Sequence, residues 1–201
     1  MHMNRKEFAL GLASLATLGC SAEEKRKGEV KMPVKVKKDR ILFVYFSRSG
    51  NTRHATETFA QACGGAKVVE VRAEKPYAAE YNACCEEARP ECRAKTLRPI
   101  RKIEGLDLAA YDVVFFGTPD WWGTMCPPIR TFITQNLAVL KTKTLCIYQT
   151  HGGGGMERVG SDFAELVAGA TVLPPRAFYG GTIKMGLGLK AFISDRLAVE
   201  V

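Results

Sequence analysis

Residues 40–54 read RILFVYFSRSGNTRH, an apolar run that changes directly into a polar stretch. The apolar part, 41–46, shows no alternation of polar and apolar residues, which is typical of a strand buried on both faces of a parallel sheet. The polar part, SRSGNT (47–52), places three hydroxyl side chains and an amide around Gly50. Two interpretations are open here: a polar turn with Ser49 or Asn51 as helix N-cap, or a loop that binds a phosphate at a helix N-terminus.

Further apolar runs alternate with helical patterns along the chain. The strand-like runs are KVVEV (67–71), YDVVFFG (111–117), KTLCIYQT (143–150) and ATVL (170–173). The patterns predict helices over 51–63, 78–88, 127–136, 157–167 and 187–197, with Pro90 beyond the second and Pro127-Pro128 opening the third. Strands that alternate with helices predict a doubly wound α/β domain, here residues 41–201, around a five-stranded parallel sheet.

Most of the excess positive charge precedes this domain. The formal net charge is +8, and residues 25–40 hold eight Lys or Arg against Glu29 and Asp39. From residue 41 onward there are 19 basic and 16 acidic residues, so the domain is close to neutral. Because the basic run has no interleaved aromatic residues, we expect residues 21–40 to be a charged spacer and not a nucleic-acid arm.

The first twenty residues have the organisation of an export signal. A charged start is followed by FALGLASLATLG (8–19), which at twelve residues is shorter than the about 20 that a membrane-spanning helix needs. Gly19-Cys20 resembles a lipoprotein cleavage site with Cys20 as the lipidated residue, and residues 5–8 resemble a twin-arginine signal. We therefore expect export, with a periplasmic or membrane-anchored location outside a bacterial inner membrane. The alternative is an apolar N-terminal helix of the domain.

Cysteine and histidine spacing gives no metal constellation. Six cysteines follow Cys20, and their pairing in an exported protein is open, although the cluster at 84, 85 and 92 permits one local bridge. No CxxC pair is present, and the three histidines lie at 2, 54 and 151. We expect no metal site.

Three unusual stretches follow the first, third and fourth predicted strands. They are SRSGNT (47–52), TPDWWGTMCPP (118–128) and THGGGG (150–155). Because ligands bind at the carboxyl ends of parallel strands, we expect these loops to meet. The first lacks the Walker and GxGxxG patterns, which favours a single terminal phosphate and hence a mononucleotide. The tryptophan pair favours a platform for a flat ligand, unless one ring packs inward, and the glycines favour close backbone approach to a ligand over a flexible surface loop.

In combination and in order, these motifs resemble those of the flavodoxin-like family, YFSxSGNT, GxPxWWG and THGGxG. Here they stand at 45–52, 117–123 and 150–155, and the similarity spans roughly residues 40–200, including 77–99. The resemblance implies strand order 2-1-3-4-5 and FMN as cofactor. It implies that the FMN phosphate is held by Ser47, Ser49, Asn51, Thr52 and the amide of Gly50. It implies that the isoalloxazine is lined by Thr118, Pro119, Asp120, Trp121, Trp122 and Gly123, and on the opposite side by Thr150, His151, Gly152 and Gly153.

Asp120 departs from that pattern, because similar proteins have an apolar or amide residue there. A carboxylate at this position would repel the anionic reduced flavin and lower its reduction potential. The resemblance implies an electron carrier with no catalytic residue of its own, and the leader predicts its export. One alternative is an FMN-dependent reductase of a quinone or similar small acceptor, with His151 as candidate proton donor. Another is a flavin-free binding module. The redox partner stays open, although the slightly basic core predicts one unlike the basic partners of acidic flavodoxins.

Overall fold

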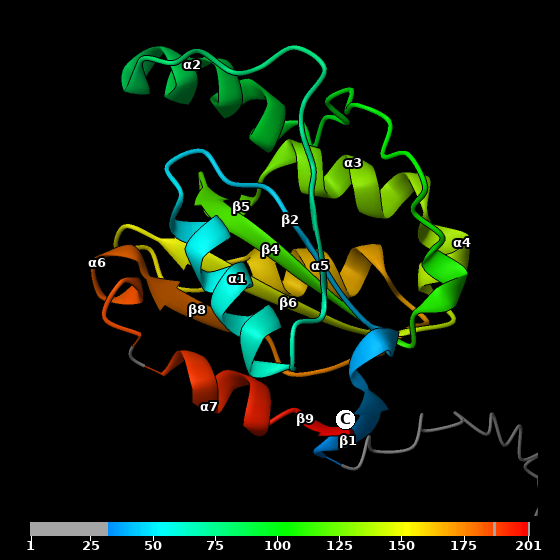
Figure 1. Ribbon diagram of the computed structural model, residues 1–201. Coiled ribbons are helices and arrows are strands. Elements are labelled where there is room, and N and C mark those ends of the chain that lie inside the picture. The colour runs from blue at the N-terminus through cyan, green and yellow to red at the C-terminus, as the bar shows by residue number, and fades with distance from the viewer. Residues whose placement is uncertain (1–31, 187, 201) are drawn as a thin grey trace, which may run out of the picture.

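The computed structural model describes residues 32–186 and 188–200. The predicted export signal and Cys20 lie outside the described residues. A mainly parallel sheet runs through the described part and is covered by helices on both faces (Figure 1). Within these residues, no helix has the length and apolar character needed to cross a membrane.

The sheet follows the path β3-β2-β4-β6-β7. These strands are β3 (Lys67–Glu70), β2 (Ile41–Tyr45), β4 (Val113–Trp121), β6 (Thr144–His151) and β7 (Thr171–Val172). Counted along the chain, this path runs in the expected order 2-1-3-4-5, and all its pairings are parallel.

The prediction of five parallel strands is wrong in detail, because the sheet has seven. β5 (Thr124–Met125) pairs antiparallel with β4, and β8 (Arg176–Tyr179) pairs with β6 beyond the end of β7. The edge position is thus shared by two short strands. Pro174 and Pro175 lie between them, and proline cannot donate a hydrogen bond to a strand ladder.

Two apolar layers sandwich the sheet. Successive residues of β2 face opposite sides, so that Phe43 belongs to one core cluster and Val44 to the other. The first layer is covered by α1 (Asn51–Ala62), α6 (Gly180–Ile183) and α7 (Leu189–Ser194). The second is covered by α3 (Pro127–Gln135), α4 (Leu137–Leu140) and α5 (Val159–Leu166). Every residue of β2 is buried, which confirms the expected two-sided strand.

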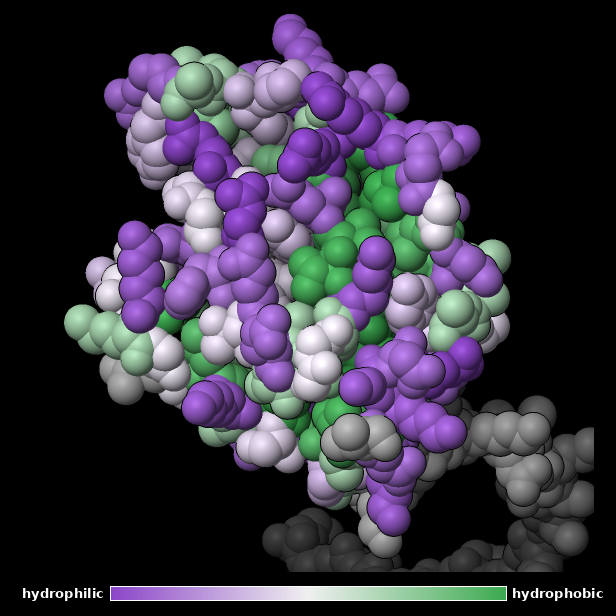
Figure 2. All heavy atoms as spheres, viewed as in Figure 1, coloured by the Kyte–Doolittle hydropathy of each residue, from purple (hydrophilic) through white to green (hydrophobic). Residues whose placement is uncertain are grey.

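The remaining helix, α2 (Tyr81–Arg93), lies at the top of Figure 1, contacts α3 and β4, and adds no residue to either core cluster. It belongs to the long connection from β3 to β4, which also holds the 3₁₀ turn η2 (Leu108–Ala110). The helix predicted over 78–88 is corrected, because α2 continues through Pro90. Most side chains on the face shown in Figure 2 are hydrophilic, with hydrophobic residues visible near its middle.

Both ends of the described chain meet in a second sheet. β1 (Val34–Lys37) pairs in parallel with β9 (Leu197–Glu200), and η1 (Lys38–Arg40) leads from β1 into β2. The spacer predicted over 21–40 therefore includes a strand, since Val36 packs into the first core layer. The last predicted helix, 187–197, ends instead at Ser194, and Leu197 begins β9.

Candidate cofactor site

A cleft of about 820 Å³ opens at the carboxyl ends of β2, β4 and β6. All three predicted loops contribute to it, as expected from their places in the sheet. Nine of the predicted site residues line it: Ser49, Asn51, Pro119, Asp120, Trp121, Trp122, Thr150, His151 and Gly152. The other six lie outside the lining: Ser47, Gly50, Thr52, Thr118, Gly123 and Gly153.

The N-terminus of α1 has no side-chain cap. Gly50 is the N-cap residue, and its φ of 90° lies in the left-handed region that glycine adopts readily. The first amides of a helix have no acceptor within the helix, so at α1 they stay available. At α2, by contrast, Glu80 accepts from two backbone N–H groups. The alternative that Ser49 or Asn51 caps α1 is therefore wrong.

Three of the predicted phosphate residues do not line the cleft but form hydrogen bonds that fix the conformation of the loop. The Gly50 N–H donates to Ser47 Oγ at 3.1 Å and closes the turn. Thr52 is buried, and its hydroxyl shares a hydrogen bond of 2.8 Å with Thr150 Oγ1. Ser49 and Asn51 are the side chains of this loop that line the cleft.

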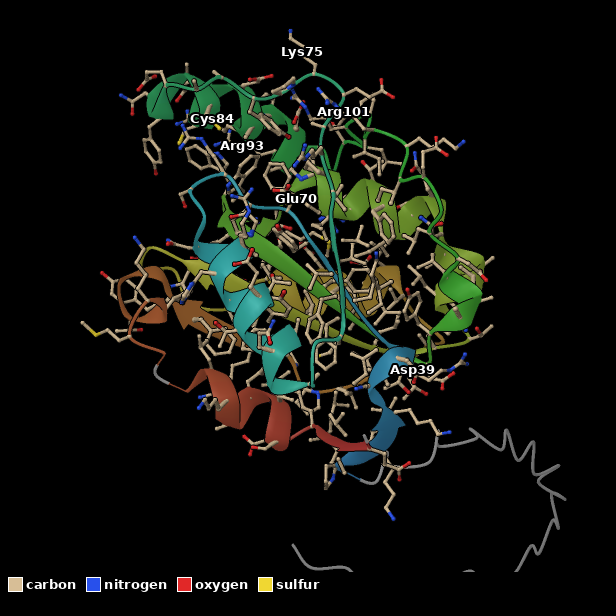
Figure 3. The ribbon with its side chains drawn as sticks, in the orientation of Figure 1. Asp39, Glu70, Lys75, Cys84, Arg93 and Arg101 are labelled. Carbon is tan, nitrogen blue, oxygen red and sulfur yellow. The ribbon has the colours of Figure 1, made fainter. Side chains whose placement is uncertain are left out.

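The two arginines of this loop point in different directions. Arg53 donates to Glu70 at 2.6 Å and to Tyr45 Oη at 3.2 Å, and these contacts raise the pKa of its guanidinium. Glu70 ends β3 (Figure 3), so Arg53 ties the helix to the sheet. Arg48 instead donates to the Ala79 carbonyl at 2.7 Å, just before α2. Arg48 therefore joins the phosphate loop to the α2 segment.

The tryptophans occupy a β-hairpin and not the loop that the sequence predicts. β4 extends to Trp121, which pairs with Thr124 across the two-residue turn Trp122-Gly123. Both turn residues have positive φ, 57° and 74°, as a type I′ turn requires. Under the hairpin, the buried Thr118 hydroxyl accepts from the Cys126 N–H at 3.0 Å.

The two tryptophan rings have different environments. Trp121 packs inward, with edge-on contacts to Tyr77 and Phe46 at centroid distances of 4.7 and 5.5 Å. Trp122 is 41% exposed, and its indole N–H donates to the Cys85 carbonyl at 3.2 Å. The alternative that one ring packs inward is thus confirmed for Trp121, and Trp122 is the ring left exposed at the cleft.

Asp120 shares its surroundings with a second carboxylate. Its Oδ1 accepts from the Gly123 N–H at 3.1 Å. A Cβ added at Gly154 would meet both Asp120 Oδ2, at 2.7 Å, and Glu157 Oε1, so the two acids lie close together. Burial and the negative charge of Glu157 raise the pKa of Asp120.

The imidazole of His151 is oriented by the glycine loop. Its Nδ1 accepts from the N–H groups of Gly153 and Gly155 at 3.1 and 3.0 Å. The neutral ring therefore carries its proton on Nε2. The ring of Tyr179 lies 5.9 Å away, centroid to centroid.

Sequence reasoning missed two groups of cleft residues. One lies at the end of β8 and directly after it: Tyr179, Gly180 and Gly181; the other is on α2: Tyr81, Asn82, Cys84, Cys85, Glu86, Ala88 and Arg89. The aromatic residue and glycine pair after a strand were a usable signal for the first group. The second had none, because its exposed positions read as the solvent face of an amphipathic helix.

The described residues contain neither a disulfide nor a cluster of metal ligands. The six cysteines from Cys63 to Cys146 are all free thiols, so the local bridge considered for 84, 85 and 92 is not formed. Burial raises the pKa of Cys84 on α2 (Figure 3). Over residues 32–186 and 188–200, no three His, Cys, Asp or Glu side chains gather as metal ligands.

Comparison with known proteins agrees with the α/β fold described above. A family model described as Flavodoxin matches residues 40–188. The chain belongs to the flavodoxin family. Three solved structures are similar to this family member. A candidate flavoprotein from Bacteroides eggerthii DSM 20697 is 25% identical, with a TM-score of 0.61 over 76% of this chain and 98% of that one.

The other two similar structures are less than a quarter identical and show the fold. A flavoprotein from Lactobacillus acidophilus NCFM, in complex with FMN, is 21% identical with a TM-score of 0.61, covering 73% of this chain and 97% of that one. The two-electron reduced flavodoxin of Megasphaera elsdenii is 19% identical with a TM-score of 0.51, covering 77% and 96%. Nearly the whole length of each relative aligns with this family member.

Proposed function

We propose that this flavodoxin-family chain binds FMN in the cleft and works as an electron carrier. The observation that carries the proposal is the uncapped N-terminus of α1, which lies at the same cleft as exposed aromatic rings. A mononucleotide with a flat ring system needs both features. The L. acidophilus relative in complex with FMN supports the same cofactor.

The phosphate end of the ligand fits the α1 loop. The first amides of α1 and the positive end of its dipole stabilise an anion without a lysine. Ser49 and Asn51 line this end and supply further donors from side chains. The buried Thr52–Thr150 hydrogen bond holds the loop against β6.

The ring end fits the opposite part of the cleft. Trp122 and Tyr179 offer exposed aromatic faces, 41% and 51% accessible, for stacking. The His151 Nε2–H is available as a donor to a ring heteroatom, since Nδ1 is engaged by the glycine loop. When bound, FMN supplies the electron chemistry, and these residues orient the ring and exclude water from it.

The test compares FMN with riboflavin, which has the same ring and no phosphate. We expect FMN to bind at least about 100-fold more tightly, because two or more hydrogen bonds to a charged phosphate are lost with riboflavin. Binding is measured by quenching of flavin fluorescence, and anaerobic reduction followed by absorbance then counts the electrons. Equal affinity for the two flavins would contradict the phosphate site, and failure of both to bind would leave only the flavin-free module.

A second candidate is reduction of a small acceptor by the bound flavin. It is favoured by the proton on His151 Nε2, because His151 lines the cleft. Anaerobic mixing of the reduced protein with a quinone separates the two functions. Oxidation faster than that of free reduced FMN supports a reductase, and slower oxidation supports a carrier.

We also propose export and a membrane tether through Cys20. The support is the leader sequence, with its charged start, short apolar stretch and Gly19-Cys20. Cells fed a labelled fatty acid should label the wild-type protein and not Cys20→Ala. Absence of label from both proteins would contradict the tether, and replacement of Arg5-Lys6 that leaves export unchanged would contradict the twin-arginine route.

A further inference from the structure

The cleft extends beyond the contacts assigned to FMN. Its α2 wall carries Tyr81, Cys85 and Arg89, and none of these is needed to hold the phosphate or to stack on the ring. Tyr81 is 66% exposed, an unusual state for a large aromatic side chain in a folded domain. Of the five exposed large hydrophobic residues in the described chain, three line this one cleft: Tyr81, Trp122 and Tyr179.

Two aromatic rings on this side each form a cation–π contact with an arginine. The guanidinium of Arg89 lies 4.3 Å from the ring centroid of Trp122. The guanidinium of Arg48 lies 5.4 Å from that of Tyr81. Such pairs present a flat apolar face next to a positive charge, which suits a ring that bears an anion.

Neither guanidinium is fully used by the protein. Arg48 donates to the Ala79 carbonyl, a neutral acceptor. Arg89 forms an ion pair with Glu86 at 3.0 Å, yet its Nε is buried without a hydrogen-bond partner. The Arg89 side chain as a whole is still 38% exposed at the cleft, so it can donate to a ligand there.

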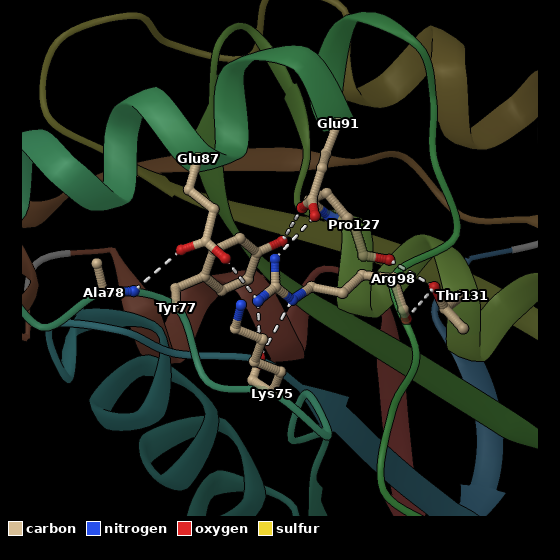
Figure 4. Close-up of polar contacts among 8 residues, drawn as sticks. All are labelled: Lys75, Tyr77, Ala78, Glu87, Glu91, Arg98, Pro127 and Thr131. Carbon is tan, nitrogen blue, oxygen red and sulfur yellow. Dashed lines mark hydrogen bonds and ion pairs between the residues drawn. The ribbon is translucent and has the colours of Figure 1, made fainter.

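The α2 wall is held in place by one buried side chain. Arg98 is 6% exposed and reaches Glu87 and Glu91 of α2, each at 2.8 Å (Figure 4). It also donates to the Lys75 carbonyl at 2.7 Å and stacks on Tyr77 at 3.7 Å. The wall is therefore a built surface and not a mobile flap.

We propose that the α2 side of the cleft is a second binding site, which takes a small planar aromatic anion beside the flavin. Aromatic carboxylates and hydroxyquinone enolates share this chemistry. The ring lies against Tyr81, and the anionic oxygen accepts from Arg48 and Arg89. The inference rests on the proposed function, because this site lies in the same cleft as the residues that would hold the flavin.

The test uses 2-naphthoate and its neutral analogue 2-naphthamide, which share one ring system and differ in charge. Binding of each to the full chain loaded with FMN is measured by equilibrium dialysis. We expect naphthoate to bind at least about five-fold more tightly than naphthamide, because one partly exposed charge pair contributes a binding free energy of about this size. Arg48→Gln and Arg89→Gln should each remove most of this preference, and Tyr81→Ala should weaken both ligands.

Arg93→Gln is the matched control, since Arg93 is exposed in the last turn of the same helix and does not line the cleft (Figure 3). It should leave both affinities within two-fold of the wild type. Equal binding of naphthoate and naphthamide, or an effect of Arg93→Gln equal to that of Arg48→Gln, would overturn the second site.

FMN loading is measured first by absorbance, and dialysis is repeated without FMN. A chain that takes FMN but neither naphthyl ligand refutes the second site alone. A chain that does not load FMN refutes the proposed function, whatever its affinity for naphthoate. The two failures are thus distinguished.

Discussion

Replacement of Arg98 by methionine should destabilise the domain by about 3 kcal/mol. Methionine keeps much of the side-chain volume, so the change removes mainly the charge and the donors. In the wild type, Arg98 forms ion pairs with Glu87 and Glu91, and two of its nitrogens donate to the Lys75 carbonyl at 3.2 and 2.7 Å. All these partners lose the hydrogen bonds from Arg98 at once.

The magnitude follows from the burial of the partners. Breaking a fully buried ion pair costs about 3–5 kcal/mol, because the remaining charge stays desolvated. The side chains of Glu87 and Glu91 are 30% and 21% exposed, so they recover part of their hydration, and we place the loss near the lower limit. For a domain of this size, about 3 kcal/mol corresponds to a fall in Tm of about 6–12 °C.

Urea unfolding followed by far-UV circular dichroism measures this loss, with Arg93→Met at the exposed end of α2 as control. The control should change the free energy of unfolding by less than about 0.5 kcal/mol, as an exposed site does. A loss below about 1 kcal/mol for Arg98→Met would refute the reasoning, since Arg98 would then not hold α2.

The pH dependence of the same variant gives a second readout. Burial by itself would raise the pKa of Glu87, but the hydrogen bonds from Arg98 and the Ala78 N–H outweigh it, and the pKa is lowered. A lowered carboxyl pKa stabilises the fold above the unfolded value, 4.5, and this contribution is lost as the pH falls through the folded value. The difference in free energy of unfolding between the wild type and Arg98→Met should therefore become smaller as the pH is lowered.

Three further variants test the site and the core. Asp120→Asn should raise the reduction potential of bound FMN by about 40 mV, equivalent to about 1 kcal/mol between partly solvated charges. Potentiometry should show that the difference in reduction potential between the wild type and Asp120→Asn becomes smaller as the pH falls, because Asp120, with its raised pKa beside Glu157, becomes neutral in the wild type. A difference that does not depend on pH would contradict this. Trp122→Asn should weaken FMN at least about ten-fold in a fluorescence titration and should not lower the urea midpoint, since asparagine tolerates positive φ; unchanged affinity would remove the stacking role. Tyr148→Phe should cost about 1 kcal/mol in urea unfolding, because it removes the buried hydrogen bond of 2.5 Å to Thr56; no loss would mean that water replaces it.

The sheet and the position of the cleft were predictable from local signals. The run at 41–46 has the composition of a strand buried on both faces, and Ile41–Tyr45 is fully buried. The polar loop after it begins a helix where expected, at Asn51. Because parallel strands place their carboxyl ends together, the three unusual loops had to meet. The site then follows from topology.

What escaped prediction depends on contacts between distant residues. Pro90 normally indicates a helix end, yet α2 passes through it because Glu91, one position later, is held by Arg98. The strand β1 has only four residues, and its partner β9 lies at the other end of the chain. Neither partner is visible within a local window of sequence.

The roles within the predicted site were equally hidden. Thr52 and Thr150 carry hydroxyls suited to a phosphate, but they bond to each other across α1 and β6. Such pairing depends on the register between helix and strand, which spacing along the chain does not reveal. Ser49 and Asn51, next to them in sequence, line the cleft instead.

Backbone strain gives an independent reason to regard the hairpin as functional. Among the described residues, the non-glycine residues with positive φ are Lys95, Trp122 and Glu157. Two of these meet at Gly123, because Trp122 precedes it and a Cβ added to it would collide with the Glu157 carboxylate. Asparagine or glycine fits a type I′ turn without this strain, whereas a tryptophan there costs about 1 kcal/mol or more. The chain tolerates this conformational strain at the position where the turn exposes the Trp122 indole to the cleft. Such strain is expected where a side chain serves ligand binding more than folding.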